Sequence, residues 1–167
     1  MKRFVNKKQL VAGLLAFVAG ALEYLLHRPS DVLSVGESFQ KTLGRLPIQA
    51  NLFGPFAGVA PDFFHPLAFS LVTMSVIPEA TKQMRLAVCL VWLTLELMLE
   101  IGQNFPTQIL LCLQRFHVEK SLSPITGYLS AGTYDPWDLL AICLGIIAAY
   151  IIGKKTGVKP LRAKEGM

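Results

Sequence analysis

Four apolar segments separated by polar stretches dominate the hydrophobic pattern of this chain. They cover residues 10–26, 63–77, 86–101 and 136–152. Each is somewhat shorter than the ~20 residues that a helix needs to cross a membrane, but flanking residues can extend it. The pattern predicts an all-α, polytopic integral membrane protein with a bundle of about four transmembrane helices. These helices form a single membrane domain over residues 1–152, followed by a basic cytoplasmic tail, 153–167.

Composition and charge agree with this prediction. The chain has 167 residues, of which 53% are hydrophobic and 16% charged, whereas about a quarter of a soluble domain is charged. The net charge is +5, but the basic residues flank apolar segments and do not alternate with aromatic ones, so no nucleic-acid partner is expected. Eleven of the 16 Lys and Arg residues lie in the two termini and in the turn 78–85. The positive-inside rule therefore places both termini in the cytoplasm.

This topology leaves two long outer loops, residues 27–61 and 104–135. In the first loop, residues 35–46 are expected to form a surface helix. In the second, residues 108–116 are too short to span and are expected to lie in the membrane interface or to re-enter it. One alternative stays open for the first segment, because basic residues precede an apolar core as in a cleaved signal peptide.

Polar residues inside or at the ends of the apolar segments are the candidates for a functional site. A carboxylate at membrane depth is costly unless it is paired, protonated or hydrated, so it indicates a functional site by default. The topology brings most of these groups toward the outer face. The predicted polar site comprises Asp62, His65, Glu96, Glu100, Gln103, Asp135 and Asp138.

Spacing places three of these residues together. Glu96, Glu100 and Gln103 follow one another at i, i+4 and i+7, so they share one face of the third helix. Asp62 and His65 begin the second helix from the outside, as Asp135 and Asp138 begin the fourth. Three helices therefore present polar groups at similar depth.

Such a cluster could hold protons, ordered water or a divalent cation, for which His65, Glu100 and Asp138 are the candidate ligands. Simpler roles are also open. Asp135, followed by a proline, has the sequence of a helix N-cap, and Asp62 could be another. Glu100 caps no helix, so its structural alternative is a hydrogen bond between helices.

The order of the polar residues also resembles the pattern of the VanZ-like family of small bacterial membrane proteins. The resemblance covers roughly residues 62–152. It rests on Asp62-x-x-His65, Glu100-x-x-Gln103 and Asp138 followed seven residues later by Gly145, each placed at the end of an apolar segment. The chain departs from the family at two positions. Ile142 stands where an Asn is usual, and Gly132 stands where an Arg is common.

The resemblance implies a protein of the cell envelope in the bacterial inner membrane. Its outer site would bind a lipid-linked cell-wall or polysaccharide intermediate, or a glycopeptide-type ligand. One alternative is a membrane-embedded hydrolase or transferase that uses Glu100 or His65 as a base, although no recognised catalytic motif is present. Another is a structural assembly partner without catalysis, in contact with a membrane protein or a second copy of the chain.

Overall fold

The structure is a computed structural model that describes residues 5–27, 53–77, 80–117 and 122–157. Within these ranges every regular element is a helix, which confirms the predicted all-α class. The elements are α1 (Lys7–His27), the 3₁₀ turn η2 (Gly54–Phe56), α3 (Ala60–Ser75), α4 (Lys82–Gly102), α5 (Pro106–Arg115), α6 (Ser123–Ala131) and α7 (Pro136–Thr156).

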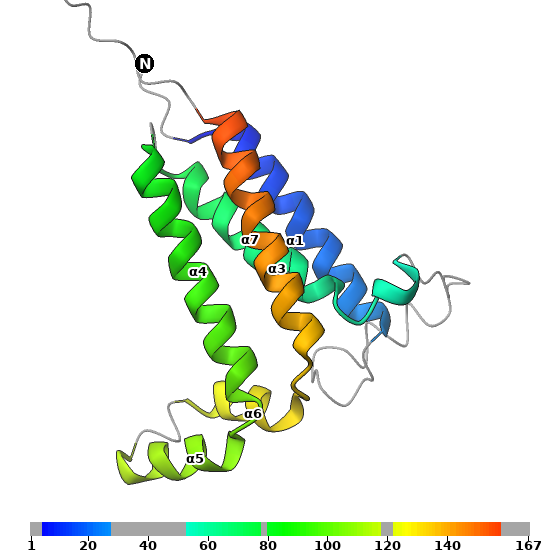
Figure 1. The fold of residues 1–167 in the computed structure, drawn as a ribbon, viewed down its shortest axis with the longest axis vertical. Coiled ribbons are helices and arrows are strands. Elements are labelled where there is room, and N and C mark those ends of the chain that lie inside the picture. The colour runs from blue at the N-terminus through cyan, green and yellow to red at the C-terminus, as the bar shows by residue number, and fades with distance from the viewer. Residues whose placement is uncertain (1–4, 28–52, 78–79, 118–121, 158–167) are drawn as a thin grey trace, which may run out of the picture.

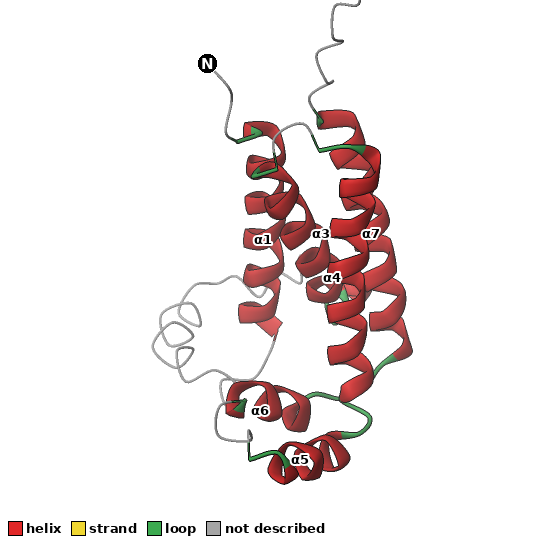
Figure 2. Cartoon of the chain, turned by 90° about the vertical axis from the view of Figure 1, so that its left-hand side faces the viewer, coloured by secondary structure: helices red, strands yellow, loops and turns green. Residues whose placement is uncertain are grey.

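The four longer helices form an elongated bundle. Helices α1 and α4 run in one direction along it, and α3 and α7 run in the other (Figure 1). Helix α3 packs against both α1 and α7, and α4 packs mainly against α7. The short helices α5 and α6 lie together at one end of the bundle, across its long axis (Figures 1 and 2). The start of α1 and the end of α7 lie at the opposite end.

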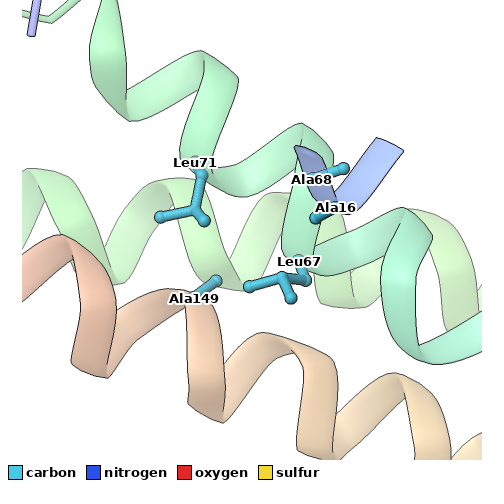
Figure 3. Close-up of a cluster of buried hydrophobic side chains, with 5 residues drawn as sticks. All are labelled: Ala16, Leu67, Ala68, Leu71 and Ala149. Atoms are coloured by element: carbon cyan, nitrogen blue, oxygen red, sulfur yellow. The ribbon is translucent and has the colours of Figure 1, made fainter. Parts of the chain in front are cut away.

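Small side chains allow α1, α3 and α7 to approach closely. Their shared core contains Ala16, Leu67, Ala68, Leu71 and Ala149 (Figure 3). Helices α3 and α7 approach each other closely at Gly145, where a Cβ atom would lie 2.3 Å from the carbonyl oxygen of Phe63. Close contact through small residues is typical of helices that pack without a hydrophobic driving force between them.

A second core cluster attaches α4 to the bundle. It contains Met74, Cys89 and Ile146, which come from α3, α4 and α7. Beside it, the rings of Phe69 and Trp92 stack with centroids 4.8 Å apart. The Trp92 indole N–H also donates a hydrogen bond of 3.0 Å to Thr73 Oγ1. The indole therefore combines ring stacking with a satisfied polar atom, as buried Trp side chains usually do.

The outer surface of the long helices is strongly apolar, although small residues dominate the interior. The large hydrophobic side chains exposed on α1, α4 and α7 include Val11, Leu14, Leu15, Phe17, Val18, Leu22, Leu86, Leu90, Val91, Leu95, Met98, Leu140, Leu144, Ile147 and Ile151. Within the described residues, α7 is the one helix long and apolar enough to cross a membrane by length and composition. Only 33% of its most apolar stretch is buried inside the molecule.

Charged residues separate along the bundle axis. The described ranges contain seven Lys and Arg residues, and six of them lie at the end where α1 begins and α7 ends. These six are Lys7, Lys8, Lys82, Arg85, Lys154 and Lys155, and the seventh is Arg115. The six described carboxylates occupy the other half, namely Glu23, Asp62, Glu96, Glu100, Asp135 and Asp138. We call these halves the cationic end and the acidic end.

Hydrogen bonds hold the cationic end together. The side chain of Asn6 donates to the carbonyl oxygen of Thr156 at 2.9 Å, and its backbone N–H donates to that of Ser75 at 2.8 Å. Gln9, which is buried, donates to the carbonyl oxygen of Gly153 at 3.1 Å. The Ser75 and Thr156 carbonyls, in the last turns of α3 and α7, thereby gain partners that they would otherwise lack. The Gly153 carbonyl, which also accepts from the Gly157 N–H, gains a second partner.

The helices differ from the predicted segments mainly at their ends. Helix α3 begins three residues before the predicted 63–77 segment and ends at Ser75. Helix α7 continues to Thr156, so residues 153–156 are helical and do not belong to the tail. The short apolar segment 108–116 lies almost entirely in helix α5, Pro106–Arg115. Helix α6 was not predicted, and the expected surface helix at 35–46 lies outside the described residues.

Candidate functional site

Glu100 is the centre of a polar network at the acidic end. Its side chain is 3% exposed, near the end of α4. Oε1 accepts a hydrogen bond of 3.2 Å from the backbone N–H of Asp135, and Oε2 accepts one of 3.0 Å from Gln103 Nε2. Both carboxylate oxygens are therefore engaged, and the bonds join the end of α4 to the start of α7. Hydrogen bonds to an ionised carboxylate are about twice as strong as neutral ones.

Gln103 extends this network to α6. Its Nε2 atom also donates to the hydroxyl oxygen of Tyr128 at 3.3 Å. Gly132 lies directly against the Gln103 side chain, because a Cβ atom at this glycine would be 2.1 Å from Gln103 Oε1. Tyr128 is 38% exposed, so its ring reaches the molecular surface while its hydroxyl contacts the network. We call Glu100, Gln103, Tyr128 and Asp135 the Glu100 network.

Asp135 caps α7, as its sequence predicts. Its carboxylate accepts a hydrogen bond of 3.0 Å from the backbone N–H of Trp137, and Pro136 opens the helix. Asp138 lies in the first turn and is half-buried. A negative charge there is favoured by the positive end of the helix dipole. The start of α7 is therefore enough to explain why acidic residues stand at positions 135 and 138.

Asp62 and His65 lie in the first turns of α3. The prediction that Asp62 is an N-cap is wrong, because Val59 holds that position and makes no side-chain cap. Asp62 is instead the acidic residue of the first turn. His65 is half-buried, with its ring centroid 6.0 Å from that of Phe69 and a ring carbon beside Gly20 of α1. Both residues therefore lie at the acidic end.

Glu96 lies one helical turn before Glu100 and is half-buried. In the described part of the chain it makes no hydrogen bond. Of the seven predicted site residues, the hydrogen bonds above join Glu100, Gln103 and Asp135. Glu96 lies outside these bonds, and the other three are at the acidic end in the first turns of α3 and α7.

No group of three His, Cys, Asp or Glu residues in the described ranges is arranged to hold a metal ion. His65, Glu100 and Asp138, which the sequence proposed as ligands, do not form such a group. The divalent cation considered from the sequence therefore has no assembled ligand set among these residues.

Tyr128 is the member of the Glu100 network that the sequence did not predict, and the packing of Gly132 against Gln103 was not predicted either. Helix α6, which carries Tyr128, has a proline in its first turn, and this is a common signal for a helix start. The segment is short and lies between turn residues, so it carries no clear amphipathic period. Its contact with Gln103 depends on how the chain folds back after α5, which no local pattern specifies.

Both departures from the VanZ-like pattern fit this structure. Ile142 is 1% exposed, so an apolar side chain suits its position in α7. Gly132 leaves no space for the Arg that the family commonly has, because Gln103 occupies it. Compared with protein-family models, curated proteins and solved structures, the chain matches none. The resemblance therefore stays a prediction from the sequence motifs.

Proposed function

We propose that this chain is a multi-pass protein of the bacterial inner membrane, in which α1, α3, α4 and α7 are the four spans. The exposed hydrophobic side chains of α1, α4 and α7 support this proposal. Soluble monomers rarely expose contiguous apolar patches above a few hundred Å², and a bilayer would cover these three helices at once. Helix α3 has 16 residues, which is short for a span, but α1 and α7 flank it.

The charge distribution supports an orientation with both termini in the cytoplasm. Lys and Arg are enriched on the cytoplasmic side of membrane proteins, and the cationic end contains six of the seven described. The Glu100 network then faces the outer leaflet. Trp137 is 67% exposed at the same end, as is common for Trp at a membrane interface.

We further propose a VanZ-like role in the cell envelope, in which the Glu100 network binds the head group of a lipid-linked cell-wall or polysaccharide intermediate. The geometry of Glu100 carries this proposal. Because its buried carboxylate fixes Gln103 and the start of α7, the Gln103 amide and the Tyr128 hydroxyl are held in place near the surface. Preorganised polar groups at the edge of an apolar surface suit a ligand with a polar head and a hydrocarbon chain.

Electrostatics narrow the class of head group. The acidic end contains six carboxylates and, among the described residues, one cation, Arg115. This balance favours hydroxyl, amide and amine groups over a bare phosphate. A sugar–peptide head group or a glycopeptide meets this condition.

The burial of Glu100 argues against its use as a general base, the role that the enzyme alternative gives to Glu100 or His65. A general base needs a lone pair that can reach a substrate proton, but Glu100 is 3% exposed and both of its oxygens accept hydrogen bonds inside the bundle. The same observation favours a second candidate function. In that role the network only holds α4, α6 and α7 together in an assembly partner without a ligand.

Native mass spectrometry separates these two functions. The probe is a polyprenyl diphosphate with a disaccharide–peptide head group, and the same polyprenyl diphosphate without that head group is its reference. The ligand-binding function predicts that the wild type retains the first lipid in preference to the second. It also predicts that Gln103→Ala combined with Tyr128→Phe removes this preference, while Ser130→Ala on the same exposed helix keeps it. Equal retention of both lipids by the wild type would refute the ligand-binding function and favour the assembly partner without a ligand.

A further inference from the structure

The cationic end carries an excess of like charge that the described part of the fold does not neutralise. Lys7, Lys8, Lys82, Lys154 and Lys155 are exposed, and Arg85 is half-buried. No Asp or Glu of the described residues lies at this end. The hydrogen bonds of Asn6 and Gln9 bring the starting turn of α1 close to the last turn of α7. Clustered like charges destabilise a compact state unless counter-ions gather there.

Arg85 is already committed to the fold. Its guanidinium donates to the backbone carbonyl of Ala80. One guanidinium nitrogen lies 3.2 Å from where a Cβ atom of Gly157 would be, and the side-chain stem lies beside Gly153. The positive group thus faces the last turn of α7, where the helix dipole is negative. The lysines are therefore the cations available to a ligand.

Exposed aliphatic side chains follow the lysines along the same helices. On α4, the exposed residues Lys82, Leu86 and Leu90 are spaced four apart. On α7, Ile147 and Ile151 precede Lys155 at the same spacing. Residues four apart share a helix face. Each helix therefore presents a cation at its end and, directly beside it, an apolar strip that is open to the surroundings.

We infer that the cationic end binds an anionic phospholipid, with its phosphate head group on Lys82, Lys154 and Lys155 and its acyl chains along the apolar strips of α4 and α7. Basic groups between helix ends on the cytoplasmic side are known to recognise anionic head groups, with about 1 kcal/mol from each Lys or Arg near the surface. This site rests on the proposed membrane location. It is separate from the Glu100 network and has the opposite charge.

The test uses the full-length protein purified in a mild detergent. Native mass spectrometry compares the retention of phosphatidylglycerol and phosphatidylcholine with identical acyl chains, with and without added inorganic phosphate. The wild type is expected to prefer phosphatidylglycerol. Retention that persists in inorganic phosphate shows that the whole lipid, and not free phosphate, is the ligand.

The combined Lys82→Gln, Lys154→Gln and Lys155→Gln variant is expected to lower the relative affinity for phosphatidylglycerol on the order of a hundredfold. The matched variant with Arg at all three positions keeps the charge and should keep the preference, which controls for folding. Equal retention of both lipids by the wild type, or an unchanged preference in the Gln variant, would overturn the inference and leave the membrane proposal intact. Recovery of the protein in the soluble fraction without lipid would overturn both.

Discussion

Replacing Glu100 with Gln tests whether its carboxylate holds two segments of the bundle together. The substitution keeps the size of the side chain and removes its charge. The carboxylate now accepts from two donors, the Asp135 N–H at 3.2 Å and Gln103 Nε2 at 3.0 Å. An amide can accept only one of these bonds, and its own NH₂ group then faces the other donor.

The expected loss follows from these two bonds. A hydrogen bond to a charged group contributes about 1.5–3 kcal/mol, and a neutral one about 0.5–1.5 kcal/mol. Losing one charged bond and weakening the other should therefore cost about 2–4 kcal/mol. Such a loss is a large part of the ~5–15 kcal/mol that stabilises a typical domain.

Hydrogen exchange can measure this loss where it occurs. Local opening free energies set amide exchange rates, and about 1.4 kcal/mol corresponds to a tenfold change. Amides in residues 132–138 should therefore exchange at least ~30-fold faster in the Glu100→Gln variant. Amides in the middle of α3 should change little, because the Glu100 network does not include that helix.

Glu96→Gln is the matched control. It makes the same chemical change one turn earlier on α4, at a carboxylate without a hydrogen bond in the described part of the chain. Exchange in residues 132–138 should stay at the wild-type rate. If Glu100→Gln also exchanged at the wild-type rate, or if both variants accelerated exchange equally, the role assigned to Glu100 would be refuted.

Substitutions at four further positions test other features of the fold by thermal unfolding in detergent. Gly145→Ala should destabilise the bundle by about 1–3 kcal/mol, since its Cβ would lie 2.3 Å from the Phe63 carbonyl. Gly127→Ala, with no atom within 4 Å, should be neutral or gain up to ~1 kcal/mol of helix propensity. Asp135→Ala removes the N-cap of α7 and should cost about 0.5–2 kcal/mol, whereas Asp135→Asn keeps a capping oxygen. Trp92→Phe should cost ~1 kcal/mol by removing the donor to Thr73 Oγ1, and an unchanged melting temperature would show that this bond contributes nothing.

Much of the fold could be predicted because its signals are local. Long apolar runs predicted α1, α3, α4 and α7, and Asp135 followed by a proline predicted where α7 begins. Helix ends were less accurate, since polar residues such as Lys82 and Lys154 extend a helix without contributing to its apolar pattern. Helix α6 is short and has no clear period, so its existence depends on contacts with the rest of the molecule.

The site was predictable only in part for the same reason. The spacing of Glu100 and Gln103 placed them on one helix face, and the structure joins them by a hydrogen bond. Their bonds to Asp135 and Tyr128 cross between helices that are distant in sequence, and only the tertiary fold sets those distances. Glu96 lies on the same face of α4 as Glu100, four residues earlier. It is outside the network because the start of α7 contacts α4 one turn later, at Glu100.

The native cysteine Cys112 offers the most direct test of the proposed membrane orientation. It is exposed on α5, at the acidic end. In intact bacterial cells expressing a Cys89→Ala/Cys143→Ala variant, a membrane-impermeant maleimide should label Cys112 without permeabilisation. A Lys155→Cys probe at the cationic end, in a chain with all three native cysteines replaced by Ala, should be labelled only after the inner membrane is opened. Labelling of the Lys155→Cys probe in intact cells with Cys112 protected would contradict the orientation and remove the Glu100 network from the outer leaflet.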